Sequence, residues 1–189
     1  MKSFKILLVG DSGVGKTSFV NALCVKKFEP RYISTVGVSV QPVTLKIMNG
    51  ENINLNIWDC AGQENLCGFK EAYYIDADAC IIMTDKVYGE KSVTYWSKKV
   101  NCCVNNIPIM VCRNKSDIDS TPTLSTIYSI VAFDISVKNN KNFDKPLNYL
   151  VNTLMNKHDL IVSKTIKRTG IDKNEDENEN EDDDDEDED

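Results

Sequence analysis

The sequence predicts an α/β domain with a mostly parallel sheet of six strands, helices on both faces and one antiparallel hairpin at an edge. Three short runs are almost entirely apolar, and helical stretches separate them: FKILLVG at 4–10, ACIIMTD at 79–85 and IPIMVC at 107–112. Strands that are apolar on both faces are typical of parallel sheets that helices cover on both sides. The hairpin is predicted by two alternating runs between residues 38 and 57.

Each helical stretch has apolar residues spaced three or four apart, which places them on one helix face. These positions are Phe19, Val20, Leu23 and Cys24; Val93, Trp96, Val100 and Val104; and Phe143, Leu147, Leu150, Val151 and Leu154. Proline is tolerated only in the first turn of a helix, so Pro146 predicts that the last helix begins near Asn142.

The hairpin strands meet at Asn49-Gly50. An Asn-Gly pair between alternating runs is the strongest short hairpin signal, and it predicts a type I′ turn. Pro42 interrupts the hydrogen-bond ladder of the first run, because proline has no N–H to donate. We therefore expect this strand at an edge of the sheet.

Charge divides the chain into two zones. Residues 172–189 carry 14 acids and one lysine, a net charge of −13, whereas residues 1–171 carry 15 acids and 21 bases, a net charge of +6. An acidic run without apolar residues cannot offset the entropy that is lost on ordering. We expect a folded domain over residues 1–158 and a disordered tail over 159–189 that ends in the acidic run.

Composition argues against several classes of protein. No apolar run approaches the length of about 18 residues that a transmembrane helix needs, and the N-terminal apolar stretch is too short for a signal peptide. A single histidine, His158, disfavours a Ser-His-Asp triad or a multi-histidine metal site. The seven cysteines form no C-x-x-C pair, so reduced thiols are expected rather than disulfides or a zinc site.

The first functional motif is GDSGVGKT at 10–17, between the first strand and a helical stretch. Its glycines let backbone N–H groups curl around phosphate oxygens at the positive end of a helix. Lys16 can reach the β- and γ-phosphates, and the Thr17 hydroxyl can ligate Mg²⁺. The predicted nucleotide-binding residues here are Asp11, Ser12, Gly13, Val14, Gly15, Lys16, Thr17 and Ser18.

The second motif is WDCAGQE at 58–64, where the alternating strand ends. Asp59 is well placed to hold Mg²⁺ through water, as acids at strand ends do in this class of site. Gly62 can offer its N–H to the γ-phosphate, and Gln63 can orient a water in line with it.

The third motif predicts recognition of guanine. The carboxylate of Asp117, in Asn114-Lys115-Ser116-Asp117, can accept hydrogen bonds from N1–H and from the 2-amino group of guanine. Adenine lacks this pair of donors and would leave a buried carboxylate unpaired, which costs roughly 1–3 kcal/mol or more. The aliphatic stem of Lys115 can cover one face of the base. A backbone N–H from Ser136-Val137-Lys138 can read the guanine 6-oxo group.

The order GDSGVGKT, Thr35, DCAGQE, NKSD and SVK resembles the Ras-like small GTPases over residues 4–157. This resemblance implies the Ras-like G domain of the P-loop NTPases, GTP hydrolysis, and binding of GTP or GDP with Mg²⁺. It is closer to the Ran branch, the nuclear-transport GTPases, through YISTVGVSVQP, YYIDADACIIM, NIPIMVC, DISVKNNKNFDKPLNYL and the acidic C-terminus. The last cysteine is Cys112, so we expect no prenylated tail.

The resemblance also implies roles for residues that the motifs alone do not assign. Phe28 would stack edge-on to the base, Glu29 to Thr35 would form the first switch with Tyr32 shielding the phosphates, and residues 60–74 would form the second. Thr35 would bind Mg²⁺ by its hydroxyl and the γ-phosphate by its N–H. The implied catalytic residues are Gln63, Lys16 and Thr35, and the implied metal ligands are Thr17, Thr35 and Asp59.

The partners implied by the Ran branch are importin-type nuclear transport receptors, an exchange factor and an activating protein. We expect a monomer of the nucleus and cytoplasm, without a membrane anchor or direct binding of nucleic acid. Two alternatives stay open. One is a non-prenylated trafficking GTPase of the Rab type, which Ser12 favours, and the other is a nucleotide-locked binding module whose acidic tail captures basic partners.

Two departures from the family concern the structure itself. The stretch between Asp117 and Ser136 is short, so we expect its helix to be reduced to about one turn or lost. Arg113 replaces a small residue before NKSD, and its bulk is expected to need a path to solvent.

Overall fold

The computed structural model describes residues 1–24, 34–35, 37–61, 70–85, 89–118, 126–127, 129–156 and 160–167. In chain order the elements are β1 (Lys2–Val9), α1 (Lys16–Leu23), β2 (Val38–Ile47), β3 (Asn52–Cys60), the 3₁₀ helix η2 (Lys70–Tyr73), β4 (Ala79–Thr84), α2 (Gly89–Cys103), β5 (Ile109–Arg113), β6 (Thr126–Ile127), β7 (Ile130–Asp134), α3 (Asp144–Met155) and β8 (Val162–Lys167).

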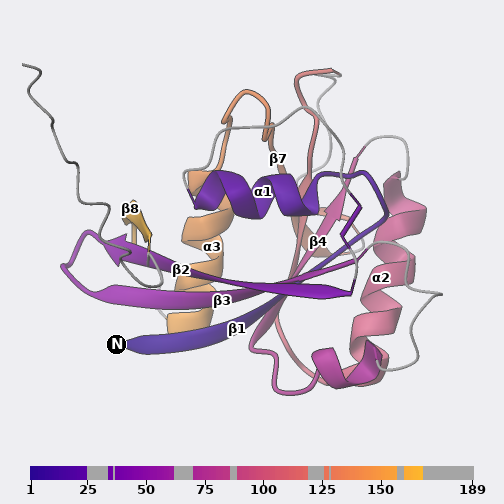
Figure 1. Ribbon diagram of the computed structural model, residues 1–189, viewed down its shortest axis with the longest axis horizontal. Helices are drawn as coiled ribbons and strands as arrows, with labels where there is room; N and C mark the ends of the chain where they lie inside the picture. The colour runs from indigo at the N-terminus through magenta and orange to yellow at the C-terminus, as the bar shows by residue number, and fades with distance from the viewer. Residues whose placement is uncertain are drawn as a thin grey trace, which may run out of the picture.

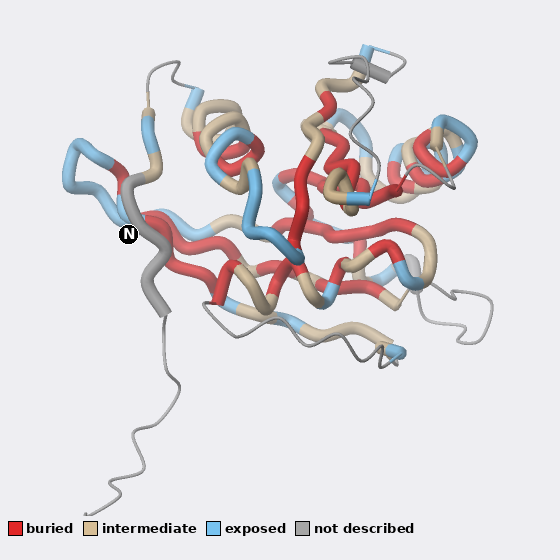
Figure 2. Tube along the Cα trace, turned by 90° about the horizontal axis from the view of Figure 1, so that it is seen from above, coloured by how far each residue is buried: buried red, intermediate tan, exposed pale blue. Residues whose placement is uncertain are grey.

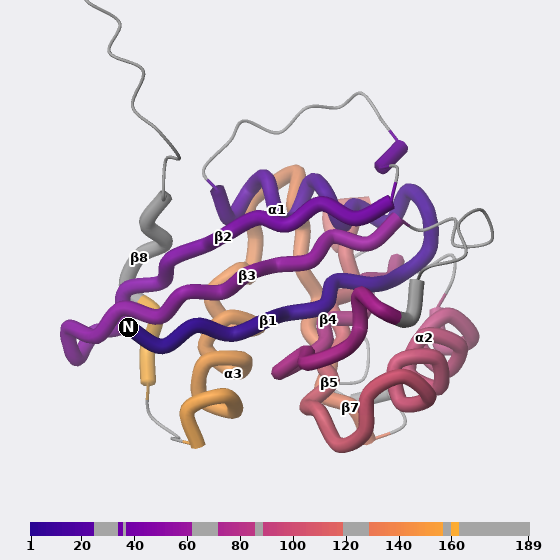
Figure 3. Tube along the Cα trace, turned by 60° about the horizontal axis from the view of Figure 1, so that its bottom comes forward, coloured from indigo at the N-terminus to yellow at the C-terminus, as the bar shows by residue number. Residues whose placement is uncertain are grey.

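The strands form one sheet in the order β6-β7-β5-β4-β1-β3-β2-β8 (Figure 1). β1 pairs in parallel with β3 and β4, and β5 pairs in parallel with β4 and β7. β2 is antiparallel to β3, and the two lie beside β1 in Figure 3. Five of these six strands lie at the runs described above and β7 is the sixth, so the predicted mostly parallel α/β fold is confirmed. The expectation that β2 lies at an edge is wrong, because β8 pairs with its outer side. Two further strands in the described part of the chain, β6 and β8, lie at the two edges and are antiparallel to their neighbours.

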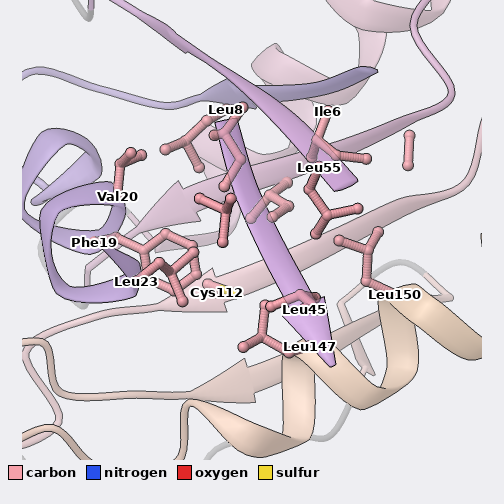
Figure 4. Close-up of a cluster of buried hydrophobic side chains, with 14 of the residues drawn as sticks. Ile6, Leu8, Phe19, Val20, Leu23, Leu45, Leu55, Cys112, Leu147 and Leu150 are labelled. Atoms are coloured by element: carbon pink, nitrogen blue, oxygen red, sulfur yellow. The ribbon is translucent and has the colours of Figure 1, made fainter. Parts of the chain in front are cut away.

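Helices cover both faces of the sheet, and each face has its own hydrophobic core. Alternate residues of β1 point to opposite faces: Ile6 and Leu8 to the core under α1 and α3, Leu7 and Val9 to the core under α2. Figure 4 shows side chains of α1 and α3 converging on strand residues in the first core. In Figure 2 the buried residues follow the central strands and the inner sides of the helices. This double burial explains why the end of β1, from Ile6 to Val9, and the strands β4 and β5 are almost entirely apolar.

The hairpin forms where predicted, but the predicted type I′ turn is wrong. The Gly50 N–H donates to the Ile47 carbonyl at 3.0 Å, and the Ile47 N–H donates to the Glu51 carbonyl at 2.9 Å. Gly50 has a φ of 90°, whereas Asn49 does not have the positive φ that a type I′ turn requires. Three residues therefore connect the strands, with the glycine taking the left-handed position that follows a type I turn.

The helix positions agree with the apolar periodicity. α3 begins at Asp144, so Pro146 lies in its first turn as predicted. The described residues between β5 and β7 include a turn at 116–118 and the strand β6. The expectation that the helix here is reduced or lost concerns mainly residues 119–125 and 128, which lie outside the description, so it stays a prediction. Within the described ranges, no helix is both long enough and apolar enough to cross a membrane.

Strand β8 was not predicted, and it lies in the segment that the sequence indicated as disordered. Two features distant in sequence hold it: the outer edge of β2, and the side chains of Asn148 and Asn152 on α3. Ordered structure therefore continues to Lys167, past the boundary predicted at residue 158. The prediction of disorder for the acidic run concerns residues outside the description.

Candidate functional site

The loop between β1 and α1 requires glycine at two positions. Gly10 has a φ of 144°, and a Cβ atom there would lie 2.0 Å from the Met83 carbonyl oxygen. Gly15 has a φ of 99°, and a Cβ atom there would lie 2.4 Å from Asn114 Nδ2. The spacing of the GDSGVGKT glycines thus lets this loop pass close to β4 and to the loop after β5.

Lys16, the first residue of α1, is buried and folds back over this loop. Its Nζ donates hydrogen bonds to the carbonyl oxygens of Gly10 at 2.8 Å and Asp11 at 2.9 Å. A buried ammonium group beside the N-terminus of a helix makes this end of α1 electropositive. The loop therefore suits an anionic ligand such as a phosphate group.

Three predicted metal ligands, from α1, β3 and the segment before β2, meet beside the loop. The Thr17 hydroxyl donates to Asp59 Oδ2 at 2.6 Å and lies 2.8 Å from the Thr35 hydroxyl. Asp59 is 1% exposed, and its Oδ1 has no hydrogen-bond partner among the described residues. Burial raises the pKa of Asp59, although the bond from Thr17 and the charge of Lys16 oppose this. A buried carboxylate with an unpaired oxygen is costly unless a cation joins it.

The predicted base-binding residues come together at the ends of β5 and β7. Asp117 Oδ1 accepts a hydrogen bond from the Ser136 hydroxyl at 2.6 Å, and this bond lowers the pKa of Asp117. Lys115 Nζ lies 2.7 Å from Asp85 Oδ2, at the end of β4. This ion pair fixes the end of the Lys115 side chain next to the residue that follows β4. The hydroxyl of Ser136 fixes the orientation of the Asp117 carboxylate.

Asn114 connects the loop between β1 and α1, which we call the phosphate loop, to the loop after β7, which carries the predicted base-binding residues. Its Nδ2 donates to the Val14 carbonyl at 2.9 Å, and its Oδ1 accepts from the Val137 N–H at 3.0 Å. Both bonds are buried, and they connect the first motif to the SVK motif. The sequence offered no signal for this double role, because it depends on three loops meeting in space.

We expect Asn114→Ala to lower the free energy of unfolding by about 2–4 kcal/mol, because it leaves the Val14 carbonyl and the Val137 N–H buried without partners. Urea unfolding measures this loss. Asn101→Ala, on the exposed side of α2, is the matched control and should change stability by less than about 0.5 kcal/mol. Equal stabilities of the two variants would contradict the linking role of Asn114.

The lowered pKa of Asp117 provides a second test. Ser136→Ala removes the hydroxyl donor and should raise the pKa of Asp117 towards its ordinary value, whereas Ser136→Thr should keep it low. The sign follows from linkage: a depressed pKa stabilises the fold above the ordinary aspartate range, and this contribution is lost as the pH falls through the lowered pKa. The carboxyl carbon shift of Asp117 in an NMR titration reports the pKa directly. No difference between the two variants would contradict the assigned hydrogen bond.

Two contacts near the site were not predicted. Trp96, recognised from the sequence only as a core residue, donates from Nε1 to Asp11 Oδ1 at 3.3 Å and so ties α2 to the phosphate loop. Arg113 is 7% exposed, and its Nε lies 2.6 Å from Asp134 Oδ1 on the neighbouring strand. The expectation that Arg113 needs a path to solvent is therefore wrong, because an acid on β7 satisfies its charge.

The remaining predicted residues divide into two groups. Among those described, Val14 and Val137 are buried, Lys138 is exposed, and Ser12, Gly13 and Ser18 lie on the loop and first turn of α1. Phe28, Glu29, Tyr32, Gly62 and Gln63 lie outside the described residues, so their roles stay predictions. Within the described part, no group of three or more His, Cys, Asp or Glu side chains forms a metal cluster.

Residues 5–117 match the family described as Ras of Complex, Roc, domain of DAPkinase. The match extends from β1 through Asp117, and therefore includes the phosphate loop, Asp59 and the NKSD motif. It does not include Ser136 and Val137, whose placement in the site follows from the contacts with Asp117 and Asn114 alone.

Proposed function

The chain belongs to the Roc family of the Ras-like GTPase superfamily, and we propose that it is a Ran-like molecular switch that binds GTP and GDP and slowly hydrolyses GTP with Mg²⁺. Membership of this superfamily implies a guanine nucleotide ligand, typically with Mg²⁺. Small GTPases are also generally regulated by an exchange factor and an activating protein.

The observation that carries the proposal is the double hydrogen bond of Asn114, because it makes the phosphate loop and the base-binding loops one site. A nucleotide spans both halves, with its phosphates at the loop after β1 and its base at the loops after β5 and β7. We assign phosphate binding to the loop N–H groups and to Lys16. We assign recognition of guanine to Asp117 and to the N–H groups of Ser136, Val137 and Lys138.

The chemistry of the donor set at Thr17, Thr35 and Asp59 fits Mg²⁺. These side chains offer oxygen atoms only, one of them the unpaired Oδ1 of the buried Asp59, and Mg²⁺ prefers oxygen ligands with few protein carboxylates. When bound, Mg²⁺ neutralises negative charge on the phosphates. Thr17 and Thr35 would hold it, with Asp59 acting directly or through water.

Hydrolysis in this proposal needs a positioned water rather than a covalent intermediate. Gln63 is the residue proposed to orient that water, and Lys16 stabilises the charge that builds on the phosphate oxygens. Thr35 would connect the γ-phosphate to the segment before β2, so that loss of this phosphate releases the segment.

The Ran-like role rests on four stretches that resemble the Ran branch, YISTVGVSVQP, YYIDADACIIM, NIPIMVC and DISVKNNKNFDKPLNYL, and on the acidic C-terminus. It leads to a direct test. The Gln63→Leu protein loaded with GTP should bind purified importin-type receptors, and the GDP-loaded protein should bind them more weakly. Binding to vesicle tethers instead would favour the trafficking alternative, to which Ser12 points. Binding that does not depend on the nucleotide would favour the locked binding module.

A further inference from the structure

The outer edge of β2 is covered by the chain's own C-terminal strand. β8 pairs with it in antiparallel register, from Val43 opposite Lys167 to Ile47 opposite Val162, with a register shift after Lys46. The Met48 N–H donates to the Ile161 carbonyl at 2.9 Å and extends this contact to the hairpin turn. Without β8, the backbone groups on this side of β2 would be open to another strand.

Two asparagines of α3, one turn apart, hold the backbone at the first residue of β8 and just before it. Asn152 Nδ2 donates to the Leu160 carbonyl at 2.9 Å, and Asn152 Oδ1 accepts from the Leu160 N–H at 2.8 Å. Asn148 Oδ1 accepts from the Val162 N–H at 2.8 Å. These amides bond to main-chain groups, which every sequence except proline carries. Together with the β2 edge they form a groove that recognises an extended backbone.

The direction of the hydrogen bonds along β2 shows where this edge ends. The Ile47 N–H points to the β3 side, and the Met48 N–H points to the segment before β8. Because these directions alternate along a strand, the backbone N–H and C=O groups of even-numbered residues in β2 point towards β8. Thr44 and Lys46 therefore present their N–H groups to β8. Pro42 faces the same side without an N–H, and the last pair in the described part of the ladder is Val43–Lys167. The described docking edge thus spans residues 43–48.

We propose that this groove, made by the outer edge of β2 and by Asn148 and Asn152, is a docking site for an extended basic peptide, and that β8 covers it until such a peptide displaces it. Displacement exchanges one set of backbone hydrogen bonds for an equivalent set. β8 pairs with a single strand, and elements at a sheet edge open locally at lower cost than central strands.

The basic character of the partner follows from charge. The covering segment itself contains Lys164, Lys167 and Arg168 and no acid between residues 160 and 170. The run that begins at Asp172 follows this segment in the sequence and has a net charge of −13. A basic peptide that resembles the covering segment is therefore attracted to this end of the chain, and the attraction weakens as salt is added.

A matched pair of proline substitutions in the full-length protein tests the cover. In the regular part of the ladder, Ile166 lies opposite Thr44 and its N–H faces β2, whereas the N–H of Thr165 faces away. Ile166→Pro should accelerate amide hydrogen exchange at Thr44 and Lys46 by at least about tenfold, and Thr165→Pro should not. The amides of Val43 and Leu45, which face β3, should stay protected in both variants and so report that the domain is folded. Equal exchange at Thr44 and Lys46 in both variants would overturn the proposed cover.

Docking itself is tested with the peptide VSKTIKRTG, which has the sequence of residues 162–170. Fluorescence anisotropy should show at least about tenfold tighter binding to the Ile166→Pro protein than to wild type or Thr165→Pro, and the affinity should fall with added salt. A peptide with proline at the position of Ile166 should not bind. Equal binding to all three proteins, or binding that salt does not change, would overturn the proposal. Affinity for GDP should be the same in all three, so this test is separate from that of the proposed function.

Discussion

Replacing Asp117 by asparagine is expected to abolish the preference for guanine and to create a preference for xanthine. In the proposed function, the carboxylate accepts two hydrogen bonds from guanine, from N1–H and from the 2-amino group. The amide of asparagine offers one acceptor and one donor, so it cannot accept both. Xanthine has a carbonyl at position 2, which the new N–H donor can meet.

The expected size follows from one lost bond and one bond that no longer involves a charge. Hydrogen bonds to a charged group contribute about 1.5–3 kcal/mol and neutral ones about 0.5–1.5 kcal/mol, so GTP affinity should fall by roughly 10²- to 10³-fold. Competition between GTP and XTP for the purified protein measures the change. Asp144→Asn, at the exposed start of α3, is the control that should leave selectivity unaltered. Retained GTP selectivity in the Asp117 variant would show that this residue does not read the base.

Lys16→Ala should weaken GDP and GTP together, because the proposed function places the ammonium group against phosphate oxygens that both nucleotides have. Truncating one partner of a desolvated charge pair costs about 2–5 kcal/mol, which corresponds to a loss of affinity of roughly 30- to several-thousand-fold. The variant also loses the bonds from Nζ to the carbonyls of Gly10 and Asp11, so its thermal unfolding has to be measured beside its affinity.

Lys91→Ala on the exposed face of α2 is the matched control for Lys16→Ala and should bind both nucleotides as wild type does. Isothermal titration with GDP and a non-hydrolysable GTP analogue gives the two affinities. A loss confined to one nucleotide, or no loss in a folded Lys16→Ala protein, would mean that the ammonium group does not hold the phosphates.

Features that depend on local sequence could be predicted from it. The apolar runs identified the parallel strands because both faces of these strands are buried, and the spacing of Val93, Trp96 and Val100 identified the buried face of α2. The phosphate loop was identified for a similar reason. Gly10 and Gly15 are required by positive φ angles and close backbone contacts, which belong to a loop of fixed length.

Features that depend on partners distant in sequence could not be predicted from the sequence. The double bond of Asn114 and the contact of Trp96 with Asp11 join elements that only the folded chain brings together. The stretch that forms β8 is polar and basic, which indicated a tether. The side chains that bond to its backbone and to the residues just before it belong to Asn148 and Asn152 on α3. The apolar periodicity of α3 identified only the buried face of this helix and gave no role to these polar positions.

Single-turnover hydrolysis of GTP by the purified full-length protein with Mg²⁺ tests the central claim most directly. An intrinsic rate of roughly 10⁻⁴ s⁻¹ is expected, as for small GTPases without an activating protein. Gln63→Leu should bind GTP equally well and hydrolyse it at least about tenfold more slowly, because leucine fills the space without orienting water. A wild-type protein that binds no guanine nucleotide, or that hydrolyses GTP no faster than the Gln63→Leu protein, would contradict the assignment of a GTP-hydrolysing switch.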